Sequence, residues 1–248
     1  MPDAENGPPT TFRLLVVPGV TVDRWSRLWS ERLPEVQLEL VPADAADAPA
    51  LLTADADAGL VRLPVDPDAL HAIPLYTEVT VVVVQRDHLL AAADELTIAD
   101  LADETVLWPL DDVLGWAGTP AAPAVVAGHR PATTAEAVEL VAASVGVLIV
   151  PQSLARAHHR RDLTYRVLTD APTSAVGLAW ARDRHTDLVE EMIGIVRGRT
   201  ANSTRGGRAP APEPARRRAA PRATPPSGRS GARRDGGKPR TPPKRRGR

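Results

Sequence analysis

Short apolar runs alternate with amphipathic stretches between residues 12 and 198. The clearest run is EVTVVVVQ at residues 78–85, and a continuous β-branched run of this kind is typical of a strand buried on both faces. Trp25, Trp29 and Leu33 recur at the spacing of one helix face, which predicts an amphipathic helix. The same pattern predicts strands at 12–17, 36–41, 58–63, 105–109, 147–150, 163–168 and 175–180, and helices at 99–103, 135–145, 153–159 and 188–196.

The order of these elements indicates an α/β fold. Strands that alternate with helices form βαβ units, so the sequence predicts mostly parallel sheets. The helix at 135–145 begins with a capping box of Thr133 and Glu136, and Gly146 is expected just after its end, where glycine is favoured. Residues 109–131 are rich in Pro, Ala and Gly, and their pattern predicts neither a helix nor a strand.

Composition changes sharply after residue 198. Residues 199–248 contain none of the large apolar side chains and are dominated by Arg, Pro, Gly, Ala and Ser. Burial there cannot offset the roughly 1–2 kcal/mol per residue that ordering a backbone costs, so the segment is predicted to be a disordered basic tail. A disordered leader is expected at residues 1–11, and it lacks the apolar region of a secretory signal.

The formal net charge of −1 is the sum of two opposite halves. Residues 1–198 carry 14 Arg, no Lys and 29 Asp or Glu, whereas residues 199–248 carry 16 Arg or Lys and 2 Asp or Glu. Bulk charge therefore argues against nucleic-acid binding by the body, while the tail is suited to phosphate contacts. The residues expected to make such contacts are Arg216, Arg217, Arg218, Lys244, Arg245 and Arg246.

The sequence carries no familiar enzyme motif. There is no G-x-S-x-G, P-loop or G-x-G-x-x-G pattern, and the body lacks a lysine for Schiff-base chemistry. His158 and His159 are adjacent, so a helix would point them about 100° apart rather than toward one metal ion. The pair Asp111 and Asp112 is interpreted as solvated loop carboxylates. We therefore predict a protein that is not an enzyme and uses no cofactor or metal.

Cysteine content and hydropathy exclude further classes of protein. The chain has no cysteine, so disulfides and thiolate chemistry are excluded. No apolar run reaches the roughly 18–20 residues that are needed to span a bilayer. The sequence therefore predicts a cytoplasmic protein without a membrane segment.

Four segments, taken in order, resemble the effector domain of LysR-type transcriptional regulators. The domain's first strand, ligand loop and first helix are resembled by FRLLVVPGVTVDRWSRLWSERLPEVQLELVP. Its passage into a second lobe is resembled by LHAIPLYTEVTVVVVQRDHLLA. TTAEAVELVAASVGVLIVPQSLA resembles the second-lobe ligand helix and the following strand, and AVGLAWARDRHTDLVEEMIGIVRG the return and closing helix. The resemblance extends over residues 12–198.

This resemblance implies a two-lobed type 2 periplasmic-binding-protein-like fold, with two crossover strands and a ligand between the lobes. The first lobe would comprise residues 12–86 and 177–198, and the second lobe residues 87–176. The expected activity is binding of a small organic effector, such as a carboxylate, in transcription regulation. The alternatives are an enzyme on the same fold, and a scaffold whose basic tail binds nucleic acid or acidic protein.

The resemblance also places the ligand site, between a first-lobe loop and the start of a second-lobe helix. Free N–H groups at such positions favour anions, and Thr21 and Thr133 add hydroxyls, although both are equally typical helix caps. Arg62 is interpreted as a carboxylate clamp or a surface arginine, and Trp108 as a cleft wall or a core residue. The expected ligand-binding residues are Pro18, Gly19, Val20, Thr21, Arg62, Trp108, Thr133, Thr134 and Pro151.

The same resemblance predicts how copies of the chain assemble. LysR-type effector domains dimerise side by side through the first helix, so a homodimer or a heterodimer with related regulators is expected. Trp25 or Trp29 would lie near the interface, and the alternative is that both pack on their own sheet. The family's regulators normally begin with a winged helix-turn-helix, for which residues 1–11 leave no room. A stand-alone sensor without its own DNA-binding domain is therefore expected.

Overall fold

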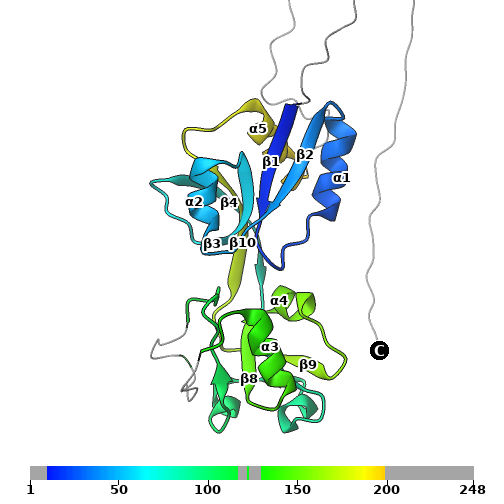
Figure 1. Ribbon diagram of the computed structural model, residues 1–248, viewed down its shortest axis with the longest axis vertical. Helices are drawn as coiled ribbons and strands as arrows, with labels where there is room; N and C mark the ends of the chain where they lie inside the picture. Colours follow the sequence, from blue (N-terminus) through cyan, green and yellow to red (C-terminus); the bar gives the residue numbers. More distant parts are fainter. Residues whose placement is uncertain (1–9, 117–121, 123–129, 199–248) are drawn as a thin grey trace, which may run out of the picture. The chain divides into compact units, whose positions relative to one another are not determined.

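The computed structural model describes residues 10–116, 122 and 130–198, which form two five-stranded sheets flanked by helices (Figure 1). The strand order is β2-β1-β3-β10-β4 in the first sheet and β6-β9-β5-β8-β7 in the second. The α/β class expected from the sequence is confirmed. The elements are β1 (Thr10–Val16), α1 (Asp23–Arg32), β2 (Val36–Pro42), α2 (Ala48–Ala54), β3 (Ala58–Leu63), β4 (Leu70–Glu78), β5 (Thr80–Gln85), η1 (Leu89–Ala92), β6 (Glu95–Leu96), η2 (Ile98–Leu101), β7 (Val106–Leu107), α3 (Thr134–Ala142), β8 (Val147–Pro151), α4 (Gln152–Ala157), β9 (Leu163–Leu168), β10 (Ser174–Ala181) and α5 (Asp187–Val196).

Both sheets are mixed, whereas the sequence predicted mostly parallel ones. In the first sheet β1 pairs in parallel with β2 and β3, but β10 is antiparallel to β3 and β4. In the second sheet β5 is antiparallel to β8 and β9, while the short edge strands β6 and β7 pair in parallel. The reason is that β5 and β10 each enter their sheet directly from the other sheet, without the helical crossover that parallel neighbours need.

We call the first sheet with α1, α2 and α5 the first lobe, and the second sheet with α3 and α4 the second lobe. The chain passes into the second lobe at Val79, between β4 and β5. Residues 80–86 were expected in the first lobe and residues 174–176 in the second, and the strands β5 and β10 correct both assignments. The run that begins at Glu78 concealed the break, because a single residue separates strands of different sheets.

Four elements were not predicted from the sequence, namely β4, α2 and the short elements η1 and β6. β4 contains Pro74, which cannot donate a ladder hydrogen bond, but β4 is an edge strand, where proline is tolerated. The seven-residue helix α2 buries Ala48 and Leu52 alone, so its apolar repeat is too short to be recognised.

Each sheet is buried on both faces, and alternate residues of one strand serve the two faces. In β1, Phe12 packs in the cluster with α1 and α5, and Leu15 packs in the cluster with α2. In β5, Val83 packs with α3 and α4, and Val84 lies in the opposite core with Trp108. The predicted strand with two buried faces is therefore confirmed for β5.

The connection from α3 to β8 differs from the expectation for Gly146. The left-handed residue is Ser144, with φ of 60°, and Gly146 has no positive φ. Gly146 instead permits a close approach of two backbones, because an ideal Cβ there would lie 2.2 Å from the carbonyl oxygen of Thr105. That oxygen accepts the N–H of Val147 at 2.8 Å, so it cannot move away without loss of a hydrogen bond.

Gly146→Ala is expected to lower the free energy of unfolding by about 1–3 kcal/mol, because the added methyl group overlaps Thr105. Gly194→Ala in α5 is the matched control. The nearest atom lies 3.9 Å from the ideal Cβ of Gly194, and removal of a helical glycine stabilises by about 0.5–1 kcal/mol. Urea denaturation measures both variants, and equal midpoints would contradict crowding at Gly146.

Some expectations fall outside the described residues. These are the leader at 1–9 and the tail at 199–248, with its basic residues Arg216, Arg217, Arg218, Lys244, Arg245 and Arg246. Thr10 and Thr11, also assigned to the leader, belong to β1. Among the helices in the described ranges, none has both the length and the apolar character required to cross a membrane.

Candidate functional site: the interlobe cleft

A cleft of about 800 Å³ is lined by residues of both lobes. The first lobe contributes the segments that follow β1 and β2 and the end of β3, and the second lobe contributes the segment after β7 with parts of α3 and α4. Pockets that hold small organic molecules have volumes of roughly 300–1,000 Å³. The lining residues are Pro18, Asp44, Ala45, Ala46, Asp47, Pro49, Arg62, Leu63, Pro64, Leu110, Asp111, Asp112, Val113, Leu114, Gly115, Ala132, Thr133, Thr134, Ala135, Leu154 and His158.

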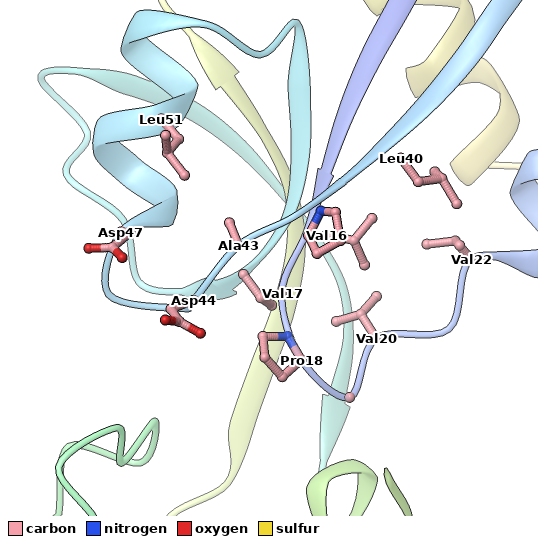
Figure 2. A pocket seen from close by; sticks show the side chains of 12 residues that line it. Val16, Val17, Pro18, Val20, Val22, Leu40, Ala43, Asp44, Asp47 and Leu51 are labelled. Carbon is pink, nitrogen blue, oxygen red and sulfur yellow. The ribbon is translucent and has the colours of Figure 1, made fainter. Parts of the chain in front are cut away.

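The structure brings part of the expected site together. Pro18, Arg62, Thr133 and Thr134 line the cleft. Gly19 and Val20 instead line a groove of about 660 Å³ on the first lobe, which Pro18 shares (Figure 2). This groove has a largely apolar wall, and Asp44 and Asp47 lie where the chain leads into α2.

Three expected residues line neither cavity. Thr21 is exposed, and Val22 rather than Thr21 occupies the N-cap of α1. Trp108 is 1% exposed and packs edge-on against Trp116, so the alternative interpretation of Trp108 as a core residue is correct. Pro151 is buried where β8 meets α4. Their positions in the family-like segments predicted that these residues would lie near a ligand, but their side chains do not line the cleft.

The start of α3 is capped by groups of the chain itself. Thr133 Oγ1 accepts the N–H of Glu136 at 3.2 Å, and a carboxylate oxygen of Glu136 accepts the N–H of Ala132 at 2.7 Å. The Asp111 carboxylate accepts both the N–H and the hydroxyl of Thr134, each at 2.9 Å. Asp111 therefore occupies the position at which the helix dipole would attract the carboxylate of a ligand.

Arg62 is buried and already paired with a carboxylate. Its side chain is 7% exposed and that of Glu78 is 10% exposed, and Nη1 of Arg62 lies 2.9 Å from Oε2 of Glu78. Nη1 also donates to the hydroxyl of Ser174 at 3.2 Å, and Nη2 donates to the hydroxyl of Ser153 at 3.0 Å and to the carbonyl of Pro18 at 3.2 Å. Arg62 is therefore neither a surface arginine nor a free clamp.

This Arg62 network joins the two lobes. Ser153, on α4 of the second lobe, donates its hydroxyl proton to Glu78 at 2.6 Å while it accepts from Arg62. Gly19 lies directly against it, with φ of 85° and an ideal Cβ position only 2.5 Å from Oγ of Ser153. Burial raises the pKa of the neighbouring Tyr76 phenol, and the charge of Glu78 raises it further, whereas Arg62 lowers it.

The cleft also contains residues that were not predicted to bind a ligand. Asp44, Asp47, Asp112 and His158 all line it. The adjacent pair of aspartates at 111–112 was visible in the sequence, but nothing in the pattern distinguished a cleft from a solvated loop. Arg62 is the one arginine in the lining set and is paired with Glu78, so the lining carries an excess of negative charge. Among the described residues, no group of three or more His, Cys, Asp or Glu could hold a metal ion.

The two tryptophans of α1 differ in environment. Trp29 is 0% exposed, packs on Phe12 with ring centroids 4.5 Å apart, and donates its Nε1–H to the carbonyl of Val36 at 3.0 Å. Trp25 is half-buried at the edge of the same cluster. An interface role for Trp29 is therefore wrong, because its ring is enclosed by its own lobe, and Trp25 stays a prediction.

Comparison with known proteins gives consistent matches. Residues 6–201 match the family described as the LysR substrate binding domain. The transcriptional regulator AlsR of Bacillus subtilis is 28% identical over 185 residues, and the match covers 68% of this chain. It covers 59% of AlsR, so this chain spans less than two thirds of that relative.

Solved structures share the fold. The effector-binding domain of BenM with its effector benzoate is similar with a TM-score of 0.65 and 21% identity, over 76% of this chain and 91% of that domain. A C206 mutant of OxyR from Corynebacterium glutamicum is similar with a TM-score of 0.63 and 20% identity, over 79% of this chain and 65% of that one. The two-lobed effector-domain fold and the family match agree, and the chain belongs to the LysR substrate-binding domain family.

Proposed function

We propose that this chain senses a small organic effector by closure of its two lobes around the interlobe cleft, with regulation of transcription as the output. The observation that carries the proposal is the convergence of the loops after β1 and β2 with the start of α3 on one cleft of about 800 Å³. A benzoate-bound effector domain of the same fold supports an effector of similar size. A ligand that contacts both lobes stabilises the closed arrangement in proportion to its preference for it.

The charges of the cleft favour an effector with an ammonium or another hydrogen-bond-donating group, rather than the simple carboxylate expected from the sequence. Asp44 and Asp47 line the cleft from the first lobe and Asp112 from the second. A ligand carboxylate would also have to displace Asp111 from the N–H and hydroxyl of Thr134. A cationic group instead gains Coulomb attraction from the acidic lining.

Thermal melting of the full chain against a panel of amines, amino acids and organic acids tests both statements. A ligand at about 100 times its Kd adds about 2.7 kcal/mol of stability, which raises the midpoint by several degrees. Asp47→Asn and Asp112→Asn are each expected to weaken a cationic ligand about tenfold, because each removes a charge-assisted contact. Asp68→Asn is the matched control, since Asp68 is exposed and does not line the cleft.

The outcomes distinguish the proposal that the cleft binds an effector from the proposal that this effector is cationic. A panel without any stabilising compound would contradict the sensor proposal. Stabilisation by organic acids alone would contradict the charge argument and leave the cleft. A ligand whose affinity neither cleft substitution changes would have to bind outside the cleft.

We infer that the sensor acts in the cytoplasm as a homodimer or as a heterodimer with related regulators, and that Trp25 lies near the contact.

A second candidate function is nucleic-acid binding by residues 199–248, which carry 16 basic and 2 acidic residues. Deletion of these residues distinguishes the two functions. Effector stabilisation should persist without them, whereas salt-sensitive retention on DNA should disappear.

A further inference from the structure

The second lobe contains another cavity, which we call the outer pocket, with a volume of about 260 Å³. Second-lobe residues alone line it. Val138 comes from α3 and Ala155 from α4, two helices that pack on the second sheet, and Leu163 comes from β9, a strand of that sheet (Figure 1). His158, at the end of α4, lines both the outer pocket and the interlobe cleft.

The floor of the outer pocket is apolar. Val83, Val138 and Leu163 belong to the core cluster beneath α3 and α4, and their exposed fractions are 5%, 4% and 4%. Their neighbours hold these side chains in place, so the floor is present before any ligand arrives. Such a surface accepts the hydrocarbon part of a ligand, and about 25 cal/mol is gained per Å² of apolar area removed from water.

The rim of the outer pocket supplies hydrogen-bond donors that the described residues leave unused. The side chains of Arg86, His158 and His159 have no hydrogen-bond or ion-pair partner within the described ranges. The hydroxyl oxygen of Tyr165 accepts from Nε of Arg156 at 3.3 Å, so its proton is left to be donated. Several donors without an acceptor, placed around one cavity, are suited to an anion.

The ion pairs near the rim do not cancel this preference. Arg160 donates to Glu139 at 2.6 Å and to Asp162 at 3.0 Å. These hydrogen bonds raise the pKa of the Arg160 guanidinium, and the bond from Arg160 lowers the pKa of Asp162. Both carboxylates are thus directed toward Arg160, and Arg86 and Arg156 add positive charge in a body that is acidic elsewhere.

We propose that the outer pocket is a second ligand site, which binds a small organic anion with an apolar body. The hydrocarbon part lies on Val83, Val138 and Leu163, and the carboxylate lies among Arg86, His159 and the Tyr165 hydroxyl. The pocket differs from the cleft in the sign of its charge, so the two sites select different ligands. His158 gives a ligand in the outer pocket a direct contact with a residue of the cleft wall.

The test is a titration of the full chain with 4-fluorobenzoate, followed by ¹⁹F line broadening and by amide chemical shifts in ¹⁵N-labelled protein. Saturable shifts are expected at residues of α4 and β9 around the outer pocket. Arg86→Gln is expected to weaken this binding about tenfold, since it removes one charge-assisted hydrogen bond. Arg161→Gln is the matched control, because Arg161 is exposed, does not line the outer pocket, and loses the same charge.

The cleft variants make the result independent of the effector proposal. Asp47→Asn and Asp112→Asn should leave binding in the outer pocket unchanged, whatever they do to the cleft. The proposal is overturned if no amides around the outer pocket shift, or if Arg161→Gln weakens binding as much as Arg86→Gln. It is also overturned if inorganic phosphate displaces the probe at equal concentration, because the site would then recognise charge without the apolar body.

Discussion

Arg62→Met is expected to lower the free energy of unfolding by about 3–5 kcal/mol, since it leaves the carboxylate of Glu78 buried without its partner. For a body of this size the midpoint of thermal unfolding should fall by about 6–20 °C. The loss is large because Nη1 and Nη2 serve four acceptors in a site where both charged side chains are at most 10% exposed. Circular dichroism melts of the full chain measure it.

A double variant identifies the cause. Replacing both Arg62 and Glu78 by Met removes the unpaired charge together with its partner, so it should be less destabilising than the sum of the single changes. Arg13→Met is the matched surface control, because Arg13 pairs with Asp55 at 2.6 Å with side-chain exposures of 33% and 67%. It should change stability by about 1 kcal/mol or less. Additive single changes, or equal losses at Arg13 and Arg62, would contradict a buried ion pair as the cause.

The network around Arg62 also reaches the interlobe cleft. Ser153 is held by Arg62 and Glu78 of the first lobe while it belongs to α4 of the second, and α4 also contributes Leu154 to the cleft. A first-lobe charge pair thus fixes a second-lobe helix beside the interlobe cleft. If the proposed effector binds in the cleft, we expect substitution of Glu78 or Ser153, which do not line the cleft, to alter the response to it.

The pattern of apolar residues predicted most of the elements that position the cleft. The run around Val83 predicted a strand with two buried faces, and the capping residues at Thr133 predicted the start of a helix that lines the cleft. Both features are local, since a run of five buried positions or a cap three residues long determines its own conformation. Arg62 lies in β3, within the strand that the apolar pattern predicted at 58–63.

Features that depend on distant contacts were not predictable in this way. Whether Trp108 faces the cleft or the core is decided by Trp116, which lies in the segment whose pattern predicted neither a helix nor a strand, and by the buried cluster on one face of the second sheet. Asp111 was interpreted as solvated because its partner, Thr134, lies 23 residues further along the chain. Arg62 is neutralised by Glu78, which comes from another strand. The role of Arg62 as a carboxylate clamp could therefore not be judged from the sequence.

Trp29→Ala is expected to destabilise the fold by about 3–5 kcal/mol, the usual cost of removing a large aromatic side chain from a core. The ring is 0% exposed, lies against Phe12 and donates to the carbonyl of Val36, so the substitution leaves a cavity and an unpaired acceptor. Trp29→Phe keeps most of the packing and loses the hydrogen bond, and it should cost about 1–2 kcal/mol. Urea unfolding followed by circular dichroism measures both.

Trp25→Ala completes the comparison, because Trp25 lies on the same helix but is half-buried. It should cost the isolated fold less than Trp29→Ala, about 1–2 kcal/mol, in proportion to the smaller area that its ring removes from water. If Trp25 lies in a dimer contact, its substitution should also shift sedimentation toward the monomer and make the unfolding midpoint less dependent on protein concentration. Trp29→Ala should lower the midpoint equally at all concentrations. A concentration-dependent loss at Trp29 would instead mean that this ring is completed by a second copy of the chain, contrary to its enclosure by Phe12 and Val36.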